Sequence, residues 1–374
     1  MIEKEKIFVT QPTLPPLNEF VKYLEDIWNS KWITNNGIYH QQFEKKISEF
    51  LDVNHCSLCA NGTLALMIGL KALRITGEVI TTPFSFVATS NAIHWAGGTP
   101  VFCDIEEDTC NIDPEKIESL ITSKTSAILP VHVYGNPCNV KRIREIAEQH
   151  DLKIIYDAAH AFYTKINGES ILNFGDISVL SFHATKVFNT IEGGAVISNN
   201  EKIKKKMDRL INFGFIDNET VSDIGLNAKM NELQSAYGLL QLQTISNEIS
   251  KRKKIAEYYR EKLKKIKGIK LLKQNKNVET SYPYFPIFID KNEFGKSRDN
   301  LFNLLKKHKI YSRKYFYPLI SHLDPYKHLK SAYLLNLPVA KKISEKVLCL
   351  PIFGDLSYMD INKITRIIKY KKNK

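Results

Sequence analysis

Short apolar runs alternate with helical stretches along the chain up to about residue 240. One such run covers residues 153–156, another covers 177–180, and a third begins after Gly194. Runs of this length, bounded by turn residues, predict buried strands. Strands that alternate with helices in this way are typical of a mostly parallel sheet wrapped by helices.

The pattern changes after about residue 240. Residues 233–245 predict a helix, and residues 251–264 predict a second, long and charged helix. Residues 282–289 predict a strand, residues 300–307 a helix, and a tyrosine-rich segment follows at 311–317. This order predicts a large α/β domain over residues 1–248 and a smaller α+β domain over residues 249–374.

The turn between the predicted strand at 177–180 and the strand after Gly194 carries Lys186. Lys186 ends the sequence Ser-Phe-His-Ala-Thr-Lys at residues 181–186, and Glu-Gly-Gly follows at 192–194. A lysine just past a strand end is well placed to form a Schiff base, the linkage that holds pyridoxal phosphate in enzymes. Because the chain has 53 Lys and Arg residues, a solvated surface lysine is the alternative for any single one.

Asp157 follows the apolar run 153–156, at the carboxyl end of a predicted parallel strand. Open α/β sheets bind ligands at this end of their strands. Pyridoxal chemistry needs a carboxylate facing the ring nitrogen, because that charge keeps the nitrogen protonated. The alternative for Asp157 is a helix N-cap before residues 158–159. For His160, three residues further on, the alternative is a histidine packed in a turn.

A strand, a tight turn and an apolar helix surround Gly62 and Thr63. Backbone N–H groups at the start of a helix, together with the helix dipole, favour a phosphate there. An ordinary turn and helix cap is the alternative. Phe84 and Phe86 lie in a predicted strand-to-helix loop, where an aromatic ring can stack on a flat cofactor. We expect core packing for at least one of these two rings.

Taken in this order, the four motifs resemble the fold-type I aminotransferases, and more narrowly the DegT/DnrJ/EryC/StrS sugar-nucleotide aminotransferases. The similarity runs nearly end to end, and it includes residues 32–37, 225–232 and 312–319. The resemblance implies a large domain, with a mostly parallel sheet between helices, and a smaller α+β C-terminal domain. It also implies pyridoxal 5′-phosphate as the cofactor.

The same resemblance assigns roles to residues of this chain. It implies that Lys186 is the Schiff-base lysine and proton shuttle. Asp157 is expected to pair with the pyridine nitrogen, Phe86 to stack on the ring, and His160 to lie near the ring hydroxyl.

The phosphate contacts implied by the resemblance are Gly62, Thr63 and Ser181, with Asn227 reaching the phosphate of a neighbouring subunit. We therefore expect a homodimer with shared active sites. An asparagine that caps the helix at 233–245 is the alternative for Asn227.

Residues 183–189 are most similar to family members that aminate C4 of dTDP-4-keto-6-deoxy-D-glucose. The expected product is dTDP-4-amino-4,6-dideoxy-D-glucose, with L-glutamate as the amino donor, for O-antigen or other glycan biosynthesis. Arg313, Tyr315 and Tyr317 are candidates for binding the diphosphate and sugar, because guanidinium groups suit phosphate oxygens. Packing of the small domain is their alternative. Amination at C3, or of a UDP- or GDP-linked keto sugar, is an alternative activity, and a non-catalytic regulator that binds the cofactor is an alternative of another class.

Composition and charge bear on three other classes of protein: nucleic-acid binding, membrane-spanning and secreted proteins. The net charge of +13 permits a polyanion-binding protein, but the basic clusters are lysines mixed with Glu and apolar residues, as on solvated helix faces. We therefore expect no nucleic-acid partner. No apolar run approaches the roughly 20 residues of a membrane helix. The charged first six residues lack the apolar core of a secretory signal, so a cytoplasmic location is expected.

The six cysteines include a C-x-x-C pair, Cys56 and Cys59, which can suggest zinc or redox chemistry. No second pair or histidines follow at metal-ligand spacing, so we expect buried free thiols and no metal site.

Overall fold

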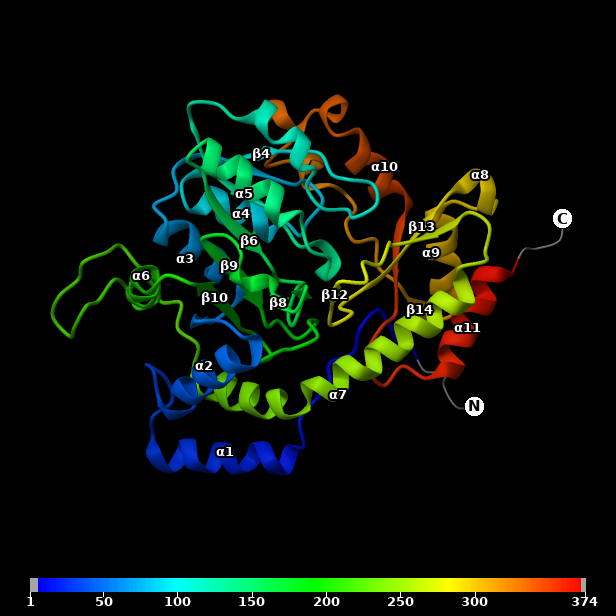
Figure 1. Cartoon of the computed structure of the whole chain (residues 1–374). Helices are drawn as coiled ribbons and strands as arrows, with labels where there is room; N and C mark the ends of the chain where they lie inside the picture. The colour runs from blue at the N-terminus through cyan, green and yellow to red at the C-terminus, as the bar shows by residue number, and fades with distance from the viewer. Residues whose placement is uncertain (1–5, 371–374) are drawn as a thin grey trace.

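The computed structural model describes residues 6–370. A seven-stranded sheet with helices on both faces forms the larger part, and a smaller α+β region lies beside it (Figure 1). The predicted α/β fold class is confirmed. Residues 1–5 of the expected non-secretory N-terminus, and residues 371–374 of the basic tail, lie outside the described residues.

The large sheet has the strand order β2-β10-β9-β6-β5-β3-β4. Only β10 runs antiparallel to its neighbours; the other pairs are parallel. Its strands are β2 (His55–Cys59), β3 (Gly77–Thr81), β4 (Gly98–Phe102), β5 (Thr125–Leu129), β6 (Lys153–Asp157), β9 (Ile177–Ser181) and β10 (Gly194–Ser198). The strands predicted at 153–156, at 177–180 and after Gly194 are confirmed.

Alternate residues of these strands enter two hydrophobic cores, one on each face of the sheet. In β6, Ile154 and Tyr156 join one core and Ile155 joins the other. A sheet buried on both faces requires continuous apolar strands, which explains the runs in the sequence. The helices that precede the C-terminal region are α1 (Leu17–Ser30), α2 (Ile38–Leu51), α3 (Gly62–Ala72), α4 (Ala88–Trp95), α5 (Val140–Gln149), α6 (Glu201–Ile211) and α7 (Glu232–Leu263).

Helix α7 crosses the molecule from α2 to the C-terminal region (Figure 1). The sequence predicted two helices here, and this was wrong, because residues 246–250 are helical too. Ser and Asn in that stretch lower helix propensity, but burial overrides it. Ile249 packs in a core of the large sheet, and a buried ion pair joins Glu248 to Arg252 at 2.6 Å. The predicted division after residue 248 falls within this helix.

The C-terminal region has its own core around a three-stranded antiparallel sheet. Its strands and helices are β11 (Ile269–Leu271), β13 (Phe285–Ile289), β15 (Val347–Leu350), α8 (Lys291–Phe294), α9 (Arg298–Lys307), α10 (Pro338–Lys346) and α11 (Tyr358–Lys369). The strand predicted at 282–289 begins only at Phe285. Tyr282 has a positive φ of 53°, and Pro283 offers no N–H for a ladder.

Five short strands complete the fold. Strand β1 (Ile7–Phe8) pairs with β14 (Ile310–Tyr311), so the N-terminal segment joins the C-terminal region. Strands β7 (Lys165–Ile166), β8 (Glu169–Ser170) and β12 (Val278–Glu279) form a small sheet. Within residues 6–370, no helix combines the length and apolar composition needed to cross a membrane.

Candidate active site

A cavity of about 280 Å³ lies at the carboxyl ends of β6 and β9, beside the start of α3. Most of the predicted site residues line it: Gly62, Thr63, Phe86, Asp157, His160, Ser181, Lys186 and Tyr315. Residues that are far apart in the sequence thus meet where parallel sheets bind ligands.

Lys186 lies in the turn between β9 and β10, and its backbone N–H donates to the carbonyl of His183 at 2.8 Å. Burial of the amine lowers the pKa of Lys186 to about 8, although the nearby Asp157 carboxylate raises it. A lysine with this pKa is partly neutral near pH 7, and the neutral amine is the form that attacks a carbonyl.

Asp157 ends β6 and is almost fully buried. Its carboxylate accepts hydrogen bonds from Thr89 Oγ1 at 2.8 Å and from the backbone N–H of Ala159 at 3.1 Å. Burial raises the pKa of Asp157, while these two bonds and the Lys186 charge lower it. No helix follows Asp157, so the helix-cap alternative is wrong. A positive group in the cavity would stabilise the ionised carboxylate.

Gly62, the first residue of α3, lies close to Ser181 at the end of β9. The Asn61 side chain caps α3 by accepting from the N–H of Leu64 at 2.9 Å. The first N–H groups of a helix have no partner within it, so those of Gly62 and Thr63 remain for an anion. A Cβ on Gly62 would lie 2.8 Å from the Ser181 Cβ, so any larger residue at position 62 would collide with Ser181.

Aromatic rings form the walls of the cavity. Phe86 lines it with 60% of its surface exposed, whereas Phe84 is fully buried in the core. The prediction that at least one of these rings is a core residue is therefore confirmed. The His160 ring lies 4.9 Å from Tyr284 and 5.7 Å from Phe316, measured between centroids.

His160 is thus packed in a turn, as its alternative stated, and it also lines the cavity. Its Nδ1 is buried without a hydrogen-bond partner. Burial, followed by the Lys186 charge, lowers the pKa of His160 well below its usual value. The imidazole is therefore neutral and one ring nitrogen is unpaired.

Three predicted residues lie outside this cavity. Asn227 is exposed between α6 and α7 and forms a bridge with Asn212. It does not cap α7, because Asn231 does. The Arg313 side chain is exposed, and the Tyr317 ring lies 4.6 Å from the Arg298 guanidinium.

Sequence reasoning missed several residues of the cavity. Tyr284 and Phe316 enter it from the C-terminal region; Tyr284 carries no local signal of a binding site, whereas Phe316 lies between the candidates Tyr315 and Tyr317. His183, Thr185 and Glu192 also line it. They stand in the motif around Lys186, so their position in the sequence was a usable signal.

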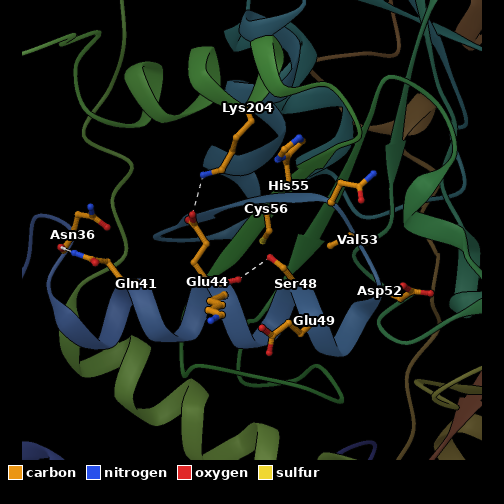
Figure 2. Close-up of a pocket in the computed structure, with 12 residues that line it drawn as sticks. Asn36, Gln41, Glu44, Ser48, Glu49, Asp52, Val53, His55, Cys56 and Lys204 are labelled. Carbon is orange, nitrogen blue, oxygen red and sulfur yellow. Dashed lines mark hydrogen bonds and ion pairs between the residues drawn. The ribbon is translucent and has the colours of Figure 1, made fainter.

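A second hollow, a groove of about 590 Å³, lies between α2 and the residues around β2 and α6 (Figure 2). Glu44 and Lys204 face each other across it at 2.8 Å, and Lys204 also contacts Asp208 at 2.7 Å. The one lysine thus pairs with two carboxylates and offers no free positive charge to a ligand. It contains none of the predicted site residues.

Cys56 lines this groove but is itself buried. All six cysteines are buried free thiols, as predicted. Within residues 6–370, no group of three or more His, Cys, Asp or Glu side chains could hold a metal ion.

A mostly parallel sheet whose strand ends bring together a half-buried lysine, a buried carboxylate and a free helix N-terminus is the arrangement that a pyridoxal-phosphate enzyme of the aminotransferase type requires. The chain belongs to the DegT/DnrJ/EryC1/StrS aminotransferase family, whose model matches residues 17–369. Enzymes of this family depend on pyridoxal phosphate.

Relatives and solved structures agree with this assignment. The chain is 53% identical to a dTDP-4-amino-4,6-dideoxy-D-glucose transaminase of Escherichia coli, over 96% of the chain and 97% of the relative. It is 35% identical to a GDP-perosamine synthase of Vibrio cholerae, over 93% and 95% of the two chains. The crystal structure of DesI with its TDP-sugar product matches with a TM-score of 0.93 and 32% identity, over 98% of this chain and 93% of that one.

Proposed function

We propose that this protein transfers the amino group of L-glutamate to C4 of dTDP-4-keto-6-deoxy-D-glucose, which gives dTDP-4-amino-4,6-dideoxy-D-glucose. The observation that carries the proposal is the 53% identity, along nearly the whole chain, to a transaminase named for that product. GDP-perosamine synthases share 35% or less, which favours the dTDP sugar over a GDP sugar. The product would serve O-antigen or other glycan biosynthesis.

The residues of the cavity fit pyridoxal phosphate. Gly62, Thr63 and Ser181 would hold the phosphate, because the Gly62 position lacks the Cβ that would close the gap to Ser181. Phe86 would lie against the ring, and the unpaired nitrogen of His160 suits a ring hydroxyl. When bound, the cofactor supplies an electron sink that stabilises negative charge on the substrate carbon bearing the amine.

The chain's own groups then have separate tasks. Lys186 Nζ would hold the cofactor covalently and, once released, move a proton at the carbon that gains or loses the amine. Its lowered pKa makes a larger fraction of the amine neutral near pH 7 than in an ordinary lysine, and both tasks require the neutral form. Asp157 would remain ionised opposite the ring nitrogen, with Thr89 and Ala159 fixing its orientation.

Tyr315 lines the cavity, so we propose it as a contact for the sugar. Arg313 and Tyr317 lie further out, and we propose them for the diphosphate. The exposed guanidinium of Arg313 suits phosphate oxygens. The ring of Tyr317 already packs against Arg298, so its contribution is the weaker of the two.

We also propose a homodimer in which Asn227 reaches the partner's cofactor phosphate. Asn227 lies in the segment between α6 and α7, which extends away from the large sheet (Figure 1). The segment exposes apolar side chains: Phe213, Ile216, Val221, Ile224 and Leu226. Contiguous exposed apolar side chains mark an interaction surface. A cytoplasmic location, without nucleic-acid or membrane partners, fits such an enzyme.

Two measurements test the proposal. The purified protein, given L-glutamate and a panel of dTDP-, UDP- and GDP-linked keto sugars, should yield an amino product chiefly from dTDP-4-keto-6-deoxy-D-glucose, detected by mass spectrometry. A preference for a UDP or GDP sugar would overturn the substrate assignment.

Borohydride should attach the cofactor to the peptide that contains Lys186. The Lys186→Ala variant should lose both this attachment and transamination while keeping its fold by circular dichroism. Full turnover in that variant would overturn the role of Lys186.

A further inference from the structure

Two polar side chains stand at the two ends of the β9–β10 connection. His183 comes two residues after β9, and Glu192 comes two residues before β10. Both line the cavity, and His183 Nε2 lies 3.5 Å from Glu192 Oε1. About half of each side chain is exposed, so the pair lies where the cavity opens to solvent.

The orientation of His183 is fixed by the turn that carries Lys186. The backbone N–H of Thr185 donates to His183 Nδ1 at 3.2 Å, and Thr185 Oγ1 lies 2.8 Å from the same nitrogen. Because a backbone N–H can only donate, Nδ1 is an acceptor and the imidazole proton is on Nε2. That N–H is on the side of the ring facing Glu192.

Glu192 is anchored through its backbone and keeps its carboxylate largely free. Its carbonyl accepts from Thr190 Oγ1 at 2.7 Å and from Gln234 Nε2 at 2.6 Å. Among residues 6–370, His183 is the only side chain that pairs with the Glu192 carboxylate. The structure thus holds a carboxylate with unused acceptor positions beside the opening.

We propose that Glu192, supported by His183, binds hydroxyl groups of the acceptor sugar; this rests on the proposed function. A carboxylate can accept hydrogen bonds from two neighbouring hydroxyls, and bonds to charged groups are the stronger kind. The sugar of a nucleotide substrate must pass this opening to bring its ketone to Lys186.

The experiment compares ligands that differ only in the sugar. The affinity of the holoenzyme for the aminated nucleotide sugar and for dTDP alone is measured by calorimetry. Glu192→Gln should weaken binding of the sugar nucleotide by about tenfold, the value of one hydrogen bond to a charged group, and leave dTDP unchanged. Glu261→Gln, on the exposed face of α7, is the matched control and should change neither affinity.

Two further measurements distinguish binding of the sugar from the reaction with the amino donor. The 2-deoxy and 3-deoxy forms of the sugar nucleotide identify the hydroxyls, because a form that lacks a contacted hydroxyl should lose less affinity on Glu192→Gln than the complete sugar nucleotide does. The half-reaction with L-glutamate, followed by the cofactor absorbance, should proceed in Glu192→Gln at the parent's rate.

Equal weakening of dTDP and sugar nucleotide, no weakening of either, or a slowed glutamate half-reaction with sugar binding intact would each overturn the inference. Failure of the proposed function looks different, because the parent itself would then not aminate the sugar.

Discussion

Replacing Lys186 with methionine in the cofactor-free protein measures how much the partly buried amine destabilises the folded state. Burial lowers the pKa of Lys186 from 10.5 to about 8, a difference of 10.5 − 8 = 2.5 units. Each unit is worth about 1.4 kcal/mol, so the charged amine destabilises the folded state by up to about 3 kcal/mol at pH 7. The side chain keeps some solvent contact, which makes this an upper limit. Methionine has a similar length and no charge, so Lys186→Met should be the more stable protein.

The effect has a defined pH dependence. The unfolded chain keeps the Lys186 proton up to a pH near 10.5, whereas the folded chain releases it near pH 8. Between these values the unfolded state binds more protons, so the parent's free energy of unfolding rises with pH. The advantage of Lys186→Met should therefore be full below pH 8 and should vanish as the pH approaches 10.5.

Thermal unfolding at fixed protein concentration is the assay. With an unfolding entropy of about 2.1 cal/mol/K per residue over 374 residues, 3 kcal/mol corresponds to a rise in Tm of roughly 4 °C at pH 7. In a protein that already carries Asp157→Asn, Lys186→Met should raise Tm by more, because the carboxylate that raises the pKa of Lys186 is gone. A lower Tm for Lys186→Met at pH 7, or a difference that stays constant from pH 7 to pH 10, would refute the reasoning.

Three other substitutions probe the remaining site residues. Gly62→Ala should weaken cofactor binding by about tenfold or more in a spectroscopic titration, because the new Cβ lies 2.8 Å from the Ser181 Cβ; unchanged affinity would contradict the phosphate assignment. Asp157→Asn should retain the cofactor but lower turnover on the order of a hundredfold, since the charge opposite the ring nitrogen is lost, and turnover within a few-fold of the parent would argue against that role. Mixed dimers of Lys186→Ala and Asn227→Asp chains should regain part of the parent activity that each homodimer lacks; confirmed chain exchange without recovery would rule out shared sites.

The sequence was informative wherever a functional residue lies at the end of its own strand or helix. Lys186, Asp157 and Gly62 each follow an apolar run that forms a strand of the large sheet, or lie directly after the turn that ends one. The parallel order of those strands places their carboxyl ends together, so the local pattern already predicted the meeting point.

The parts that could not be predicted depend on contacts between distant segments. Tyr284 and Phe316 reach the cavity only because the C-terminal region packs against the large sheet. Phe316 stands between the two candidates Tyr315 and Tyr317, but the sequence could not show which of these three rings enters the cavity. The continuity of α7 through residues 246–250 depends likewise on the buried pair Glu248–Arg252, whose partners lie elsewhere. The helix propensity of a short stretch does not reveal whether other segments of the chain will bury it.

Helix α7 also limits how this enzyme can be engineered. Ile249 belongs to a core of the large sheet and Ile255 to the C-terminal core, within two turns of one helix. Directly before Ile249, Glu248 accepts from Thr13 Oγ1 and from the N–H of Gly354, so an N-terminal and a C-terminal segment are both tied to this point of the helix. The C-terminal region is therefore not an exchangeable module. Chimeras between relatives should be joined in loops outside residues 232–263. A junction inside the helix would combine side chains of different origin in both the core of the large sheet and the C-terminal core.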